Sequence, residues 1–95
     1  MREVFWTEQA VFDLAAIRAF ISQDSPHSAS VVVTQLIGAT DRLIAFPESG
    51  RTVPEFDNPL VREVIHPPYR IVYRLAGVDH IHILTVAPGF ARAHT

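Results

Sequence analysis

Residues 60–86, with the sequence LVREVIHPPYRIVYRLAGVDHIHILTV, decide the fold. Three runs within this stretch are rich in β-branched and aromatic residues, which favour the pleated surface of a β-sheet. Pro67-Pro68 separates the first two runs, and Gly77 with Asp79 separates the last two. Connections this short predict three strands in an antiparallel meander.

Side chains alternate along the middle run, and the alternation divides them between two faces. One face carries large apolar and aromatic side chains, namely Tyr69, Ile71, Tyr73 and Leu75. The other face carries Arg70, Val72 and Arg74. Because the apolar face requires a cover, the arginine face is expected to look outward.

Two helices in the first half of the chain are predicted to supply that cover. The first begins after Thr7, a suitable N-cap, and runs to about Ser22. Its apolar residues recur at helical spacing: Ala10, Leu14, Ile17 and Ile21. Ser25-Pro26 predicts the start of the second helix, which ends at Phe46-Pro47. The short connection between them predicts an antiparallel helical hairpin.

We therefore expect one α+β domain over residues 1–95, folded as a two-layer sandwich. The order is strand (Glu3 to Trp6), helix, helix, strand, strand, strand, with a loop from Pro47 to Pro59. The sheet is expected to be antiparallel and covered on one face by the helical hairpin, although local rules do not place the first strand in it.

Composition excludes several classes of protein. A hydrophobic content of 48% argues against disorder, and the absence of cysteine excludes disulfides and thiolate metal sites. The N-terminal stretch MREVFWTEQA has no apolar core of the length a signal peptide needs, and no run reaches the length of a membrane span, so we expect a cytoplasmic protein without a membrane partner. His80 and His82 share a strand face, but two imidazoles are too few for zinc. No metal, cofactor or catalytic residue is predicted.

The arginines are the most informative polar residues. All eight basic side chains are arginine, and residues 51–95 hold five of them against four acids. Guanidinium groups suit phosphate and carboxylate, so the candidates for a target-facing surface are Arg51, Arg62, Arg70, Arg74, His82 and Arg92. The alternative is that these arginines form structural ion pairs with Glu55, Asp57, Glu63 and Asp79.

Five segments resemble, in order, the RelE/ParE toxins of type II toxin–antitoxin systems. They are WTEQAVFDLAAIRAFI (6–21), LIAFPESGR (43–51), VREV (61–64), YRIVYR (69–74) and ILTV (83–86). The resemblance covers nearly the whole chain, and it implies the same α+β fold that the periodicity predicts.

The FPESGR and VRE segments resemble the ParE-like branch of that family most. This resemblance implies a binding inhibitor of DNA gyrase, without direct DNA binding by the toxin alone, that a cognate ParD-like antitoxin neutralises. The alternative is a RelE-like endoribonuclease that cuts messenger RNA on the ribosome. Arg70 matches an arginine of those enzymes, but their lysines have no counterpart because this chain contains no lysine.

The antitoxin is expected to bind apolar side chains that a chain of this length cannot bury in its own core. The candidates are Phe12, Phe20, Val32, Ile44 and Phe90. The expected partner is an acidic, partly disordered segment that folds over this surface and also covers the arginines.

Overall fold

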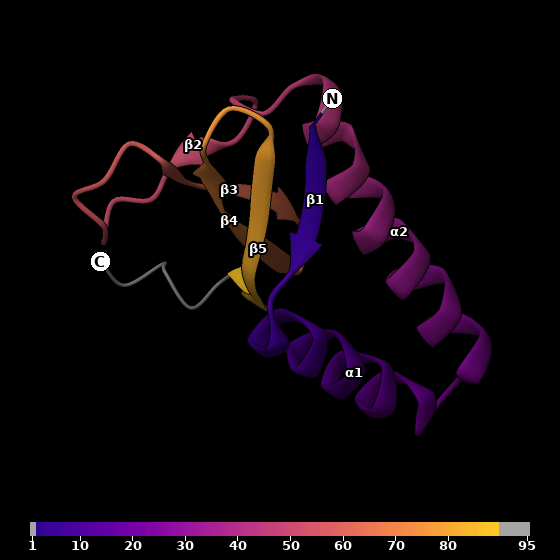
Figure 1. Ribbon diagram of the computed structural model, residues 1–95. Helices are drawn as coiled ribbons and strands as arrows, with labels where there is room; N and C mark the ends of the chain where they lie inside the picture. The colour runs from indigo at the N-terminus through magenta and orange to yellow at the C-terminus, as the bar shows by residue number, and fades with distance from the viewer. Residues whose placement is uncertain (1, 90–95) are drawn as a thin grey trace.

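The computed structural model describes residues 2–89, which form two helices packed on one face of a five-stranded sheet (Figure 1). The elements are β1 (Glu3–Trp6), α1 (Glu8–Ser22), α2 (Pro26–Ala45), β2 (Arg51–Thr52), β3 (Val61–His66), β4 (Tyr69–Ala76) and β5 (His80–Pro88). This arrangement confirms the predicted α+β two-layer sandwich.

Local capping interactions set where both helices begin. The Thr7 hydroxyl accepts a hydrogen bond from the backbone N–H of Ala10 at 3.2 Å. The Ser25 hydroxyl accepts one from Ser28 at 3.1 Å, and Pro26 occupies the first helical turn. Each cap satisfies an N–H group that the helix itself leaves unpaired. Helix α2 ends with Phe46 as its C-cap, directly before Pro47, as the sequence predicts.

The sheet is mixed, so the prediction of a purely antiparallel sheet is wrong. Strand order is β1-β5-β4-β3-β2, and β3, β4 and β5 form the predicted antiparallel meander. Strand β1 instead pairs in parallel with β5, with Glu3 opposite His80. The segment predicted as loop also contains β2, whose Arg51 lies opposite Glu63 of β3. Both differences are pairings between distant segments, which local patterns do not specify.

Helix α1 covers the part of β5 that β1 leaves unpaired. Thr7 donates its hydroxyl to the carbonyl of Ile83 at 2.8 Å. Six residues further along α1, the Asp13 carboxylate accepts from the Val86 backbone N–H at 3.1 Å and from the Thr85 hydroxyl. A carboxylate on the helix therefore substitutes for a neighbouring strand, and an exposed edge is avoided.

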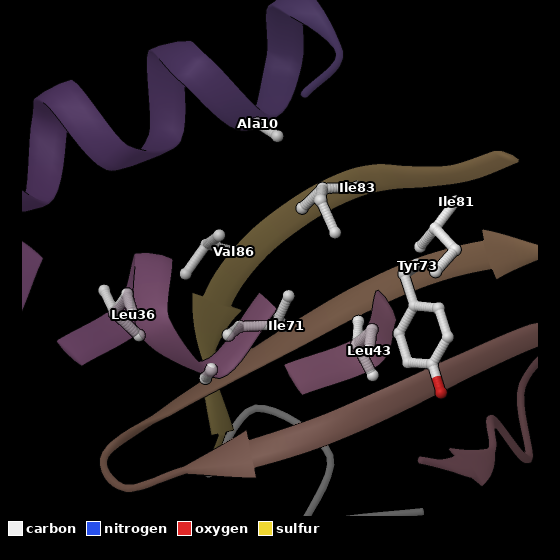
Figure 2. Close-up of a cluster of buried hydrophobic side chains, with 9 residues drawn as sticks. Ala10, Leu36, Leu43, Ile71, Tyr73, Ile81, Ile83 and Val86 are labelled. Atoms are coloured by element: carbon white, nitrogen blue, oxygen red, sulfur yellow. The ribbon is translucent and has the colours of Figure 1, made fainter. Parts of the chain in front are cut away.

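The main core lies between the helices and the sheet (Figure 2). Its buried members are Ala10, Leu36, Ala39, Leu43, Ile71, Tyr73, Ile81, Ile83 and Val86. Ile71 and Tyr73 come from the face of β4 that the alternation assigns to the interior, and Leu75 is half-buried beside them. The predicted assignment of faces is confirmed. No helix within residues 2–89 combines the length and apolar character that a membrane crossing demands.

Candidate target-facing surface

The outer face of the sheet, which is the face away from the helices, is partly covered. Strand β4 directs Arg70, Val72 and Arg74 to this side, as predicted. Val72 is nevertheless buried, because Val53 of the loop after β2 packs on it together with Val61. The loop thus builds a second, smaller apolar cluster, and only part of the arginine face is open to a partner.

Glu63 is the centre of a buried ion-pair cluster on this face. Its side chain is 0% exposed, and its two oxygens accept from Arg51 Nε at 2.8 Å and from Arg70 Nη1 at 2.9 Å. Arg70 also lies 3.4 Å from the carboxylate of Glu55, and its side chain is only 15% exposed. A buried carboxylate needs such partners, because removal from water strongly disfavours an isolated charge. The ion-pair alternative is therefore correct for Arg70.

Arg62 lies on the opposite side of the sheet from Arg70 and Arg74. It is paired in register with Tyr73, whose side chain is in the main core. Its guanidinium donates to the carbonyl of Gly50 at 2.9 Å and to that of Glu48 at 3.4 Å. The expectation that Arg62 shares the outward face is wrong, since the strand register turns it toward the loop that follows α2.

Arg62 and Tyr73 together attach the FPESGR segment (46–51) to the sheet. Its hydroxyl donates to the carbonyl of Pro47 at 2.7 Å and accepts from the N–H of Gly50 at 3.0 Å. Burial raises the pKa of this phenol. A Cβ at position 50 would lie 2.6 Å from both the Glu63 carbonyl oxygen and the Tyr73 hydroxyl. Pro47 and Gly50 of the FPESGR segment are therefore both held against the sheet by Tyr73.

Arg74 and His82 form the open part of the predicted surface. They lie opposite each other on β4 and β5, and Arg74 is exposed. The His82 ring stacks on that of His80 with centroids 6.5 Å apart, and the Phe5 ring meets His82 edge-on at 5.9 Å. Phe5, on β1, is an addition that local patterns did not identify, because the parallel pairing of β1 brings it there. We call Phe5, Arg74, His80 and His82 the outer patch.

Three of the apolar antitoxin candidates are exposed. Phe12 is 69% exposed, Phe20 is 70% exposed and Ile44 is 38% exposed. Val32 differs, because it is half-buried and packs against the main core. Phe90 and Arg92 lie outside the described residues.

A cavity of about 350 Å³ opens beside one of these candidates, Phe20. It lies between α1 and the ends of β4 and β5, and its lining is mainly apolar: Ala16, Ile17, Phe20, Pro68, Tyr69 and Pro88. The sequence did not identify this cavity, because it joins segments from opposite ends of the chain. Within residues 2–89, no three side chains of histidine, aspartate or glutamate gather where a metal ion could bind.

The fold and the positions of the five segments define a class, the small α+β toxins of the RelE/ParE superfamily. The family model described as the ParE toxin of the type II toxin–antitoxin system parDE matches residues 4–89. The chain therefore belongs to the ParE toxin family, and it is a toxin of the type II toxin–antitoxin class.

Individual relatives come from both branches of the superfamily. The chain is 42% identical over 83 residues to Toxin RelE2 of Caulobacter vibrioides, a match that covers 85% of this chain and 90% of that protein. A structure from the chromosomal ParDE system of P. aeruginosa has a TM-score of 0.74 and 26% identity, with 93% and 96% of the two chains covered. The M. tuberculosis RelBE2 toxin–antitoxin complex has a TM-score of 0.58 at 20% identity, covering 92% and 96%, which shows a shared fold alone.

Proposed function

We propose that this ParE-family toxin acts in the cytoplasm by binding and inhibiting DNA gyrase, and that a ParD-like antitoxin neutralises it. The observation that favours a binding inhibitor over a ribonuclease is the ion pair between Arg70 and the buried Glu63. Arg70 is the arginine that matches the RelE-like enzymes, and its guanidinium is already engaged with a carboxylate. A guanidinium held in this way is poorly placed to stabilise the charge on a reacting phosphate.

The outer patch is the proposed contact with the target. Arg74 offers an exposed guanidinium, and the rings of Phe5, His80 and His82 offer flat aromatic area beside it. Arginine and aromatic side chains together are typical of residues that dominate binding energy at protein interfaces. Arg51 is paired with Glu63 through its Nε, but its side chain is 63% exposed, so the rest of its guanidinium remains accessible beside β3.

The antitoxin is proposed to combine apolar anchors with acidic residues. Phe12 and Phe20 leave most of their rings exposed, and the cavity beside Phe20 would accept an apolar side chain. Carboxylates of the antitoxin would face Arg51 and Arg74. The similarity to a structure from a ParDE system supports an antitoxin as the natural partner.

Growth of bacteria that express the chain from an inducible promoter tests this proposal. We expect arrest with broken chromosomal DNA, and rescue when a ParD-like antitoxin is co-expressed. The double variant Arg74→Ala/His82→Ala should lose toxicity while its thermal melt is unchanged. Arg18→Ala, which removes an exposed arginine from α1, is the matched control and should stay toxic. Full toxicity of the double variant would remove the outer patch from the target contact.

A ribosome-dependent endoribonuclease is the second candidate. It is favoured by the 42% identity to a protein named Toxin RelE2. In that case arrested cells would contain messenger RNA cut within ribosome-bound codons, which primer extension detects, and their chromosomal DNA would be intact.

A further inference from the structure

The rings of His80 and His82 on β5 lie nearly parallel at a distance that suits a third flat group between them. Their planes differ by 14° and their centroids are 6.5 Å apart. Residues two apart on a strand are separated by about 6.4–6.8 Å, so the backbone of β5 sets this spacing. Successive bases on a nucleic-acid strand are about 3.4 Å apart. The separation of the imidazoles is therefore close to twice the stacking distance, which is the spacing that one inserted planar group requires.

Phe5 closes one side of this space. Its ring is nearly perpendicular to both imidazoles, at 83° to His80 and 86° to His82, with centroids 5.5 Å and 5.9 Å away. Because it is almost equally distant from the two rings, Phe5 lies beside the space between them rather than over either one. The side chain of His80 is 51% exposed and Phe5 is 46% exposed, so a ligand can reach this space. We call Phe5, His80 and His82 the ring slot.

Charges of opposite sign flank the ring slot. Strand order β1-β5-β4 places Glu3 on one side of β5 and Arg74 on the other. Glu3 lies opposite His80, with a carboxylate oxygen 3.9 Å from His80 Nε2. Arg74 lies opposite His82 and is exposed. Guanidinium binds phosphate in a bidentate geometry, whereas a carboxylate repels it. A ligand with one flat ring and one phosphate would therefore bind with the phosphate on the β4 side.

We infer that the ring slot binds one unpaired nucleobase of the DNA that gyrase holds, with Arg74 on the neighbouring phosphate. Bases that stack on aromatic side chains, with basic groups along the backbone, are the general mode by which proteins bind single strands. The spacing of the imidazoles suits the base, and the charge beside them suits the phosphate. An acidic peptide would engage Arg74 but would leave the slot empty. The inference rests on the proposed function for the source of the base, whereas the slot itself does not.

A slot of this kind selects against intact duplex DNA. Neighbouring bases cover both faces of each base in a duplex, so a base must leave the stack before it can enter. A base beside a cut in the DNA has lost one stacking neighbour, and gyrase cuts and reseals the DNA that it holds. The chain alone should therefore bind duplex DNA poorly, and the contact would form in the complex with gyrase.

Nuclear magnetic resonance of the purified chain tests the slot without gyrase. A short thymidine oligonucleotide should shift the imidazole signals of His80 and His82, because a base stacked on both rings changes their surroundings. The signals of His27 and His66, which lie on α2 and β3, should not move. One base and one phosphate make a small contact, so we expect a dissociation constant of about 1 mM. Unshifted imidazoles, or equal shifts with a fully paired duplex, would overturn the inference.

Substitutions separate the stacking from the charge. His80→Leu/His82→Leu removes both flat walls and should abolish binding, whereas His80→Phe/His82→Phe keeps two flat rings and should retain it. Arg74→Ala should weaken binding about tenfold, because a hydrogen bond to a charged group is lost. Arg18→Ala, the control from α1, should bind like the original chain. Equal binding by the leucine and phenylalanine pairs would contradict stacking, and tighter binding of a uridine oligonucleotide would contradict DNA as the source of the base.

Ultraviolet cross-linking in the complete system separates this inference from the proposed function. DNA that contains iodouracil would be mixed with gyrase and the chain, then irradiated. We expect cross-links between the chain and DNA that require gyrase and disappear with His80→Leu/His82→Leu. Inhibition of gyrase without such cross-links would refute the DNA contact and leave the proposed function intact. Unaffected gyrase together with oligonucleotide binding would refute gyrase as the target and as the source of the base, while the slot itself would stand.

Discussion

Replacement of Arg70 by alanine should destabilise the fold, because it removes a partner from the buried Glu63. The carboxylate is 0% exposed and shares its charge between Arg70 and Arg51. Removal of one partner from a buried ion pair typically costs about 3–5 kcal/mol. Arg51 remains, but its side chain is 63% exposed, so solvent screens its attraction and it compensates only in part. We expect Arg70→Ala to lower the free energy of unfolding by about 3 kcal/mol.

Urea unfolding at neutral pH measures this loss, and two variants isolate its cause. Arg74→Ala, on the same strand face but exposed, should change the free energy of unfolding by no more than about 0.5 kcal/mol. The pair Arg70→Met/Glu63→Leu should regain most of the stability, because well-packed apolar residues often replace a buried ion pair at little cost. Equal stability of Arg70→Ala and Arg74→Ala would refute the reasoning.

Three further predictions concern the core and the attachment of the FPESGR segment. Ile71→Ala should lower the free energy of unfolding by about 2–5 kcal/mol in a thermal melt, because the side chain is 1% exposed. Gly50→Ala should lower the melting temperature, because its Cβ would lie 2.6 Å from the Glu63 carbonyl oxygen, whereas Gly38→Ala in α2 meets nothing within 4 Å and should stabilise. Burial raises the pKa of Tyr73, so the folded state holds this proton more tightly than the unfolded chain does. The resulting stability is complete below about pH 10 and falls as the pH rises above it, and Tyr73→Phe should flatten that fall in urea titrations.

Each of these three has an outcome that counts against it. An unchanged melt for Ile71→Ala would mean that the two faces of β4 are reversed. Equal melting temperatures for Gly50→Ala and Gly38→Ala would show that the loop is not held against the sheet. Identical alkaline profiles for Tyr73→Phe and the original chain would assign the loss of stability above pH 10 to other groups.

Features that depend on neighbouring residues were predictable from the sequence. The caps at Thr7 and Ser25 act within one helical turn, and their residue types identify both helix starts. The alternation from Tyr69 to Leu75 is interrupted only by Val72, so the face that enters the main core follows from it. The order of elements follows from these two kinds of local signal.

Features that depend on strand pairing were not predictable in the same way. A shift of one residue in register moves every side chain of a strand to the other face. Arg62 therefore could not be assigned until its pairing with Tyr73 was known. The parallel pairing of β1 with β5 likewise joins the two ends of the described chain, and it brings Phe5 beside His82. Arg74 and His82 meet through the predicted pairing of β4 with β5, and the β1 pairing adds Phe5 to the outer patch.

The candidate site shows the same division. The arginine face of β4 was predicted, and Arg74 is exposed on it. Arg70 proved to be a structural residue because Glu63, on the neighbouring strand, is completely buried beside it. The sequence contained the possible partners, including Glu55 and Glu63, but spacing alone does not choose between an ion pair and an open charge.

The most direct test of the proposed function is a comparison of two purified targets under one set of conditions. The chain would be added to DNA gyrase with relaxed plasmid, and separately to ribosomes that carry a defined messenger RNA. We predict that supercoiling stops and cleaved plasmid accumulates, that the messenger RNA remains intact, and that Arg74→Ala/His82→Ala weakens the effect on gyrase. Unaffected supercoiling together with cleavage of the ribosome-bound messenger RNA would contradict the proposal and assign the chain to the ribonucleases.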